Sequence, residues 1–171
     1  MLLLAALRRS LATAVLSAAA VGACAATIYS PAAAQANSAD GKAAVAVVNR
    51  LFDAMRAGDS AGVRATFHPK AQFATAAVKD GQPLVQFESI DPFLRAVGTP
   101  HPEVWDERLS NVVVHVDGPL AVVWADYAFY LGDKFSHCGV DAFQLARTGD
   151  TWQIVSIIDT RRKQGCPDQK H

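Results

Sequence analysis

The stretch FSHCGVDAFQLAR, residues 135–147, places three chemically versatile side chains within five positions: His137, Cys138 and Asp141. A histidine beside a carboxylate can move protons near neutral pH, and a thiol can act as a nucleophile or form a disulfide. The stretch also alternates as a β-strand does, which sends neighbouring side chains to opposite faces. His137 and Cys138 are therefore expected on opposite faces, which disfavours a Cys–His dyad. His137 and Asp141 share a face and are candidates for acid–base chemistry.

The cysteines divide between two parts of the chain. Cys24 lies in an apolar N-terminal segment, which leaves Cys138 and Cys166 as an even pair in the rest of the chain. In an oxidising compartment such a pair is expected to form a disulfide, which stabilises a fold by up to about 3 kcal/mol in the loop-entropy description. Two free thiols, one of them reactive, are the alternative.

Residues 1–36 have the layout of a secretory signal peptide. Arg8 and Arg9 precede a long run of Ala, Leu and Val, which ends in the sequence Ala34-Gln35-Ala36. A basic start, an apolar centre and an A-x-A end are typical of cleaved signals. We therefore expect a periplasmic or secreted protein.

Two alternatives to this cleavage are open. The apolar run is long enough to be a retained membrane anchor. The sequence VGAC, ending at Cys24, resembles a lipobox, which would make lipidated Cys24 the N-terminus. After signal removal we expect one domain over residues 37–166, a polar tail over residues 167–171 and no membrane span.

Charge and motifs exclude several classes of partner. Lys and Arg number 16 and balance 16 Asp and Glu, and the loss of the signal arginines would leave a small acidic excess. No basic stripe is present, so nucleic-acid binding has no electrostatic support. The sequence contains no Gly-rich phosphate loop and no CxxC motif. We expect neither a metal nor a cofactor.

Hydrophobic periodicity and turn residues predict the order of the elements. Residues 39–57 and 61–67 predict helices, residues 72–89 a hairpin that turns at Asp80-Gly81, and residues 89–98 a short helix. Four strands follow, over residues 105–116, 120–131, 135–147 and 152–162, with turns at Asp117-Gly118, Gly132-Asp133 and Gly149-Asp150. This order predicts an α+β fold with helices on one face of a curved antiparallel sheet.

The turn positions also predict which side chains share a face, because register decides the faces of a strand pair. One face is expected to be an apolar wall interrupted by polar groups, and it includes Asn111, Trp124, Asp126, Tyr130, His137, Asp141 and Phe143. A buried carboxylate is costly unless it is paired, so these polar groups form either a satisfied network or the lining of a ligand cavity. The other face, smooth and apolar, is expected to pack on a second copy of the chain. Asp159 and Arg161 are expected on that second face as a rim ion pair.

Two segments carry a resemblance to a known group of proteins. The sequence NRLFDAMRAGDSAGVRATFHPKAQF and the C-terminal pair HCGVDAFQLAR and WQIVSIIDTRR resemble the nuclear transport factor 2-like superfamily, and its SnoaL-like, exported lumazine-binding-like branch. The resemblance covers nearly all of residues 39–166. It implies a cone-shaped fold, in which a curved sheet wraps around N-terminal helices and encloses a central pocket, and it implies a homodimer through the sheet. The branch name implies a heterocyclic ligand, but the superfamily includes isomerases, dehydratases, cyclases and binding proteins.

The first of three functional hypotheses is a binding protein for a small apolar or heterocyclic molecule. Trp124, Tyr130 and Phe143 would supply apolar area. The ligand would be oriented by Asn111, Asp126, His137 and Asp141.

The second hypothesis is an acid–base enzyme of isomerase, dehydratase or cyclase type. Asp126 or Asp141 would be the base and His137 the partner or acid. The early catalytic tyrosine of the isomerases has no match, since Phe52 and Phe67 stand in that helical region. The third hypothesis is an interaction protein of the cell envelope that uses the apolar second face.

Overall fold

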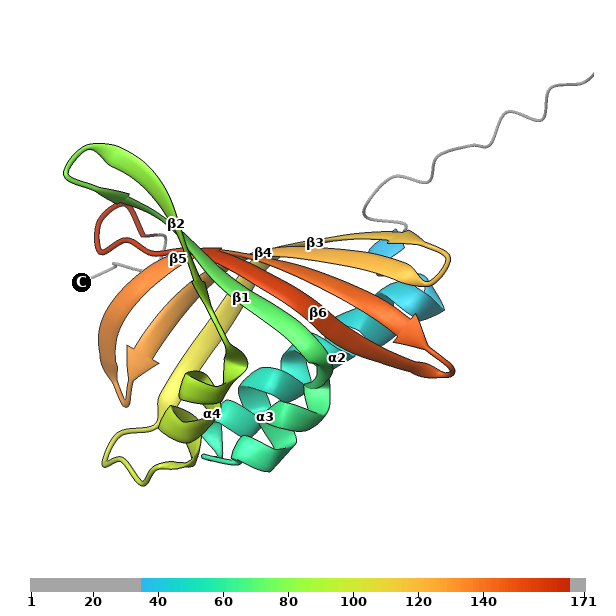
Figure 1. Cartoon of the computed structure of the whole chain (residues 1–171), viewed down its shortest axis with the longest axis horizontal. Coiled ribbons are helices and arrows are strands. Elements are labelled where there is room, and N and C mark those ends of the chain that lie inside the picture. The colour runs from blue at the N-terminus through green and yellow to red at the C-terminus, as the bar shows by residue number, and fades with distance from the viewer. Residues whose placement is uncertain (1–34, 167–171) are drawn as a thin grey trace, which may run out of the picture.

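The computed structural model describes residues 35–166 (Figure 1). The predicted signal segment, the Cys24 lipidation site and the polar tail lie outside these residues, apart from Gln35 and Ala36 at the end of the signal. Three helices, α2 (Ala39–Arg56), α3 (Ser60–Thr66) and α4 (Ile90–Gly98), lie on one side of a six-stranded sheet. Within the described range, no helix is long and apolar enough to cross a membrane.

The sheet runs in the order β2-β1-β6-β5-β4-β3 and arches over the helices (Figure 1). Its strands are β1 (Phe67–Lys79), β2 (Gln82–Glu88), β3 (Trp105–Asp117), β4 (Leu120–Leu131), β5 (Lys134–Thr148) and β6 (Thr151–Thr160). All neighbouring strands are antiparallel except β1 and β6, which are parallel. The predicted α+β fold with a curved sheet around N-terminal helices is confirmed. The sequence predicted only antiparallel pairs, because local turn signals do not reveal a pairing between strands that are distant in the chain.

Helix α2 forms because its sequence supplies both a cap and one apolar stripe. The Ser38 hydroxyl accepts a hydrogen bond from the Gly41 amide at 3.0 Å, which satisfies one of the free amides of the first turn. The stripe is buried against the concave face of the sheet and consists of Ala44, Val47, Val48, Leu51, Phe52 and Met55. The core therefore lies between α2 and the strands. Leu51, Phe52 and Met55 at its edge also line a cavity.

The register of β4 against β5 differs from the predicted one because β5 contains a bulge. The turn at Gly132-Asp133 is as predicted, and Leu131 pairs with Lys134. Ser136 is then an extra residue between the pairs Tyr130–Phe135 and Phe129–His137. A shift of one residue exchanges the faces of a strand relative to its partner. Asp126 consequently pairs with Val140, so it lies on the face opposite that of Asp141.

Two further irregularities shift the neighbouring pairs. Between β3 and β4 the two-residue loop is Gly118-Pro119, one position later than predicted, and a second irregularity lies between Ser110 and Val113. Between β5 and β6 the turn is as predicted, but an irregularity beside Leu145 brings Asp141 opposite Asp159.

Candidate functional site

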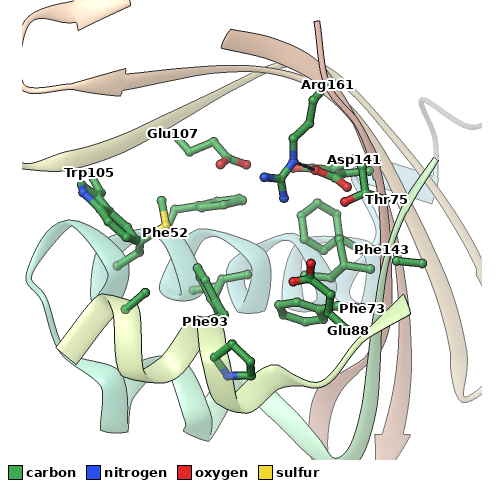
Figure 2. Close-up of a pocket in the computed structure, with 17 residues that line it drawn as sticks. Phe52, Phe73, Thr75, Glu88, Phe93, Trp105, Glu107, Asp141, Phe143 and Arg161 are labelled. Atoms are coloured by element: carbon green, nitrogen blue, oxygen red, sulfur yellow. Dashed lines mark hydrogen bonds and ion pairs between the residues drawn. The ribbon is translucent and has the colours of Figure 1, made fainter. Parts of the chain in front are cut away.

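A cavity of about 360 Å³ lies between the concave face of the sheet and helices α2 and α4 (Figure 2). Five aromatic residues from five different elements contribute to its wall: Phe52, Phe73, Phe93, Trp105 and Phe143. The ring centroids of Phe52 and Phe143 lie 6.1 Å apart, and those of Phe73 and Phe93 lie 5.6 Å apart. These separations are typical of packed aromatic pairs. The cavity therefore offers rigid, flat apolar surfaces.

Acidic side chains gather at one end of this cavity. Glu107 of β3, Asp141 of β5 and Asp159 of β6 all line it, together with Arg161 just beyond β6. Figure 2 shows Glu107, Asp141 and Arg161 converging there. Asp141 and Asp159 are direct cross-strand partners, and like charges in that position repel each other. The arrangement requires a compensating cation or a bound proton.

Arg161 compensates one of these carboxylates. Its Nε donates a hydrogen bond to Asp159 Oδ2 at 2.6 Å. The expected ion pair is thus present, but the structure places it at the cavity, whereas the sequence analysis expected it at the rim of the other face.

The second acidic unit is formed by Glu107 and Asp141, whose carboxyl groups are close enough for the pKa of each to depend on the other. Asp141 is only 4% exposed. Two carboxyl groups can share a hydrogen bond only when one of them carries a proton.

The pKa values of both groups are raised. Burial, followed by the charge of Asp141 and the hydrogen bond with it, raises the pKa of Glu107 well above its usual range. Burial raises the pKa of Asp141 to about 7, while its hydrogen bond with Glu107 acts in the lowering direction. Since desolvation disfavours the charged form of an acid, the pair holds at least one proton at neutral pH.

His137 lies in a second space of about 260 Å³ that shares Glu107, Asp141 and Arg161 with the larger cavity. Its ring centroid is 5.0 Å from that of Phe129, and Ser136 Oγ lies 3.0 Å from its Nδ1. Burial and the positive charge of Arg161 lower the pKa of His137. The imidazole is therefore neutral at pH 7.

Tyr127 lines the same second space. Its hydroxyl donates to the Thr160 carbonyl at 2.9 Å, and burial raises its pKa. The Tyr127 proton is therefore engaged with the backbone.

The structure brings together three of the seven residues predicted to share a cavity wall. Asp141 and Phe143 line the larger cavity, and His137 lines the smaller space. Their roles in binding or catalysis stay predictions.

The other four predicted residues do not face the cavity. The prediction that they share a face with His137, Asp141 and Phe143 was wrong. Trp124 is 51% exposed on the convex face of the sheet. Asn111 Nδ2 donates to Asp126 Oδ2 at 2.8 Å, and the guanidinium of Arg108 lies 4.2 Å from the centre of the Tyr130 ring. The physical reason is the extra residue Ser136 in β5, which exchanges the faces of β4 relative to β5, and Asn111 follows β4 to the convex side.

Sequence reasoning missed Glu107. It alternates with Trp105 and Leu109 in the segment WDERL, so a carboxylate stands in a row of apolar positions. An acidic residue at a position where strand alternation expects an apolar side chain indicates a buried carboxyl group. The sequence alone therefore contained the signal for Glu107.

A disulfide joins Cys138 to Cys166, which are 28 positions apart in the sequence. Beside it, the backbones of Cys138 and Arg162 exchange two hydrogen bonds of 2.9 and 2.8 Å. The segment that follows β6, and with it Arg161, is therefore fastened to β5 next to the acidic end of the cavity. No group of three or more His, Cys, Asp or Glu residues within residues 35–166 is placed to hold a metal ion.

The fold is that of the nuclear transport factor 2-like proteins. One similar solved structure is an NTF2-like protein of unknown function from Shewanella baltica, with 17% identity, a TM-score of 0.55 and coverage of 72% of this chain and 94% of that one. Another, described as a "putative dehydratase from the NTF2-like family", comes from Streptomyces avermitilis, with 20% identity, a TM-score of 0.54 and coverage of 72% and 96%. A third, described as the "beta subunit of a putative aromatic-ring-hydroxylating dioxygenase", comes from Novosphingobium aromaticivorans, with 12% identity, a TM-score of 0.59 and coverage of 71% and 88%.

The family follows from the sequence of the domain itself. Residues 39–158 match the family described as "Putative lumazine-binding", and the chain belongs to this family. The expected resemblance to the nuclear transport factor 2-like superfamily is thereby confirmed. A comparison with curated proteins gives no match.

Proposed function

We propose that the protein binds a small molecule with an aromatic or heterocyclic ring in the cavity between α2, α4 and the sheet. One observation carries this proposal: five aromatic residues line a cavity of about 360 Å³ whose acidic end holds the neighbouring carboxyl groups of Glu107 and Asp141. The rings offer stacking area, and the carboxyl pair offers a donor and an acceptor that fix orientation. The family description supports the proposal, because lumazine is a heterocycle.

The experiment is native mass spectrometry of the protein purified from its host. We expect a co-purifying small molecule that is lost on denaturation. Asp141→Asn, which keeps the shape of the side chain, should reduce its retention, whereas Asp150→Asn in the exposed β5–β6 turn should not. A protein that carries no small molecule and binds none from a fragment library would contradict the proposal.

Acid–base catalysis is the second candidate, favoured by the carboxyl of Asp141, whose pKa is raised to about 7 beside an apolar cavity. A base with such a pKa can accept a proton at neutral pH and return it. The co-purified molecule, incubated with the protein in D₂O, should then gain deuterium at carbon, and Asp141→Asn should abolish this exchange even at ligand concentrations that saturate the weaker-binding variant. Binding without exchange would favour the binding protein alone.

The proposed setting is the periplasm or the extracellular space. The layout of residues 1–36 and the disulfide support it. Mass spectrometry of the mature N-terminus tests it, and it separates cleavage after Ala36 from lipidation at Cys24.

The convex face supports a proposed homodimer. Six directly paired residues form a line across all six strands: Phe87, Ala74, Ile158, Ala142, Trp124 and Val113. We call this line the apolar row. Phe87 is 73%, Ile158 43% and Trp124 51% exposed, which is unusual for large apolar side chains. A second copy, related by a two-fold axis, would cover the row with an identical row.

A further inference from the structure

We propose that the cavity selects molecules in which the ring carries a positively charged or protonatable nitrogen, that is, organic cations such as amines and basic heterocycles. This inference names the chemical class of the ligand and rests on the binding function proposed above. It follows from the charges, the aromatic surfaces and the unmatched carboxyl pair in the cavity wall.

The charge inventory of the cavity is one-sided. Glu88, Glu107, Asp141 and Asp159 line it, and Arg161 is the one basic residue among its 17 lining residues. The protein as a whole is balanced, with 16 basic and 16 acidic residues. The acidic character is therefore local to the cavity, and an anionic ligand would be repelled there.

The carboxyl pair of half-buried Glu107 and buried Asp141 lacks a cationic partner of its own. Asp159 uses Arg161, with the Nε–Oδ2 contact at 2.6 Å. Within residues 35–166, no ion pair to Glu107 or Asp141 is formed, although Asp141 is only 4% exposed. A buried charge is costly until an opposite charge compensates it. In the free protein the compensating charge is a proton, and a ligand cation can replace that proton.

The other walls of the cavity suit a cation as well. Phe52 and Phe93 come from the helices and Phe73, Trp105 and Phe143 from the strands. Aromatic faces attract cations through their quadrupole, and this attraction grows when the cation is removed from water. Rings from two helices and three strands, together with the carboxylates at one end, form a site in which both aromatic faces and negative charges stabilise an ammonium or a protonated ring nitrogen.

The sign of the pH dependence separates this inference from its rivals. A cation competes with the proton held by Glu107 and Asp141, so its affinity rises with pH; a neutral ligand that accepts a hydrogen bond from the protonated pair loses affinity with rising pH. The other titratable or charged groups facing the pair are Asp159, Arg161, Tyr127, His137 and Glu88. Arg161 stays charged and His137 is already neutral at pH 7, so neither reverses the sign. The lining residues from α2 and α4 are all apolar.

The test uses matched sets of three probes that differ only in charge: tryptamine, 3-propylindole and indole-3-propionate, and the corresponding phenyl and quinoline series. Binding to the full-length mature protein is measured by isothermal titration calorimetry and ligand-observed NMR from about pH 6 to about pH 8, a range in which alkylamines stay protonated. We expect the amines to bind roughly tenfold more tightly than their neutral counterparts at the upper end of the range, and the acids to bind least.

Isosteric variants complete the test. Glu107→Gln and Asp141→Asn should each remove the preference for amines over neutral probes and the pH dependence of that preference, and Asp150→Asn should change neither. Circular dichroism checks that each variant is folded. Neutral or acidic probes that bind as tightly as the amines would overturn the inference and leave the proposed binding function intact. A complete lack of binding in every series would overturn both, and tight binding of Ca²⁺ or Zn²⁺ that competes with the amines would replace the organic cation by a metal.

Discussion

The two faces of the same sheet depart from ordinary protein surfaces in opposite ways. The concave face places ionisable groups in an apolar setting, with Asp141 4% exposed, whereas the convex face leaves Phe87 73% exposed to solvent. Buried acids without a cation and exposed large rings are both uncommon, because each raises the free energy of the isolated chain. The comparison supports both proposals, a ligand that covers the concave side and a second copy of the chain that covers the convex side.

The largest expected effect tests whether the aromatic wall of the cavity is also part of the core. Phe143 is fully buried and packs edge-on against Phe52, so Phe143→Ala should lower the free energy of unfolding by about 3–5 kcal/mol. Urea denaturation measures this loss. Val78→Ala, at a side chain that is 72% exposed, should cost less than about 0.5 kcal/mol. Equal costs at the two positions would show that Phe143 is not a core residue.

The disulfide should contribute the next largest effect. Cys166→Ser leaves buried Cys138 in place and opens the crosslink, so the free energy of unfolding should fall by up to about 3 kcal/mol. Denatured, unreduced mature protein should show no thiol that reacts with a maleimide, and reduced protein should show two. Two reactive thiols before reduction would contradict the bond.

A smaller effect concerns pH. The folded-state pKa of Asp141 is raised to about 7, so between about pH 4 and pH 7 the folded protein binds more protons at this site than the unfolded chain does. The free energy of unfolding should therefore fall as the pH rises through this window. Asp141→Asn should flatten that fall, with a gain of the order of 2 kcal/mol at pH 8 relative to the parent. Urea titrations at several pH values measure it, and parallel slopes in parent and variant would contradict the raised pKa.

The smallest expected effect lies on the convex face. Trp124→Glu places a charge in the middle of the apolar row and should weaken self-association by roughly tenfold or more, while the monomer stays folded. Thr148→Glu adds the same charge at an exposed position beside the β5–β6 turn and serves as the control. Sedimentation velocity over a concentration series measures self-association of the parent and of both variants. A parent protein that stays monomeric throughout would remove the proposed dimer.

Local sequence signals were sufficient for the elements and two of the three C-terminal turns. The turns at Gly132-Asp133 and Gly149-Asp150 lie where the sequence predicts them, because both require a glycine with positive φ, and Gly132 and Gly149 have φ of 57° and 61°. Helical periodicity located α2, because a helix that packs on a sheet must bury one stripe of apolar side chains.

The site was only half predictable, because bulges leave a weak local signal. Ser136 and Ser110 are ordinary strand residues by type. The irregularity at Ser136 decides whether Asp126 or Ala125 faces the cavity, and the irregularity beside Ser110 decides the face of Glu107. Asp141, His137 and Phe143 were placed together because alternation within one strand does not depend on its neighbours. Glu107 and Asp159 join them only through pairing across strands, which a single strand pattern cannot fix.

The parallel pairing of β1 with β6 constrains the order in which the sheet can assemble during synthesis. Phe67 pairs with Ile154, so strands from opposite ends of the domain must meet at the centre of the sheet. A nascent chain that has emerged only as far as β5 holds two separate pieces, the β1–β2 hairpin and the β3–β5 meander, each with an unpaired edge. Such long-range contacts are slow to form, because the chain must close a large loop before they contribute. The last strand to be synthesised is thus the one that joins the two pieces.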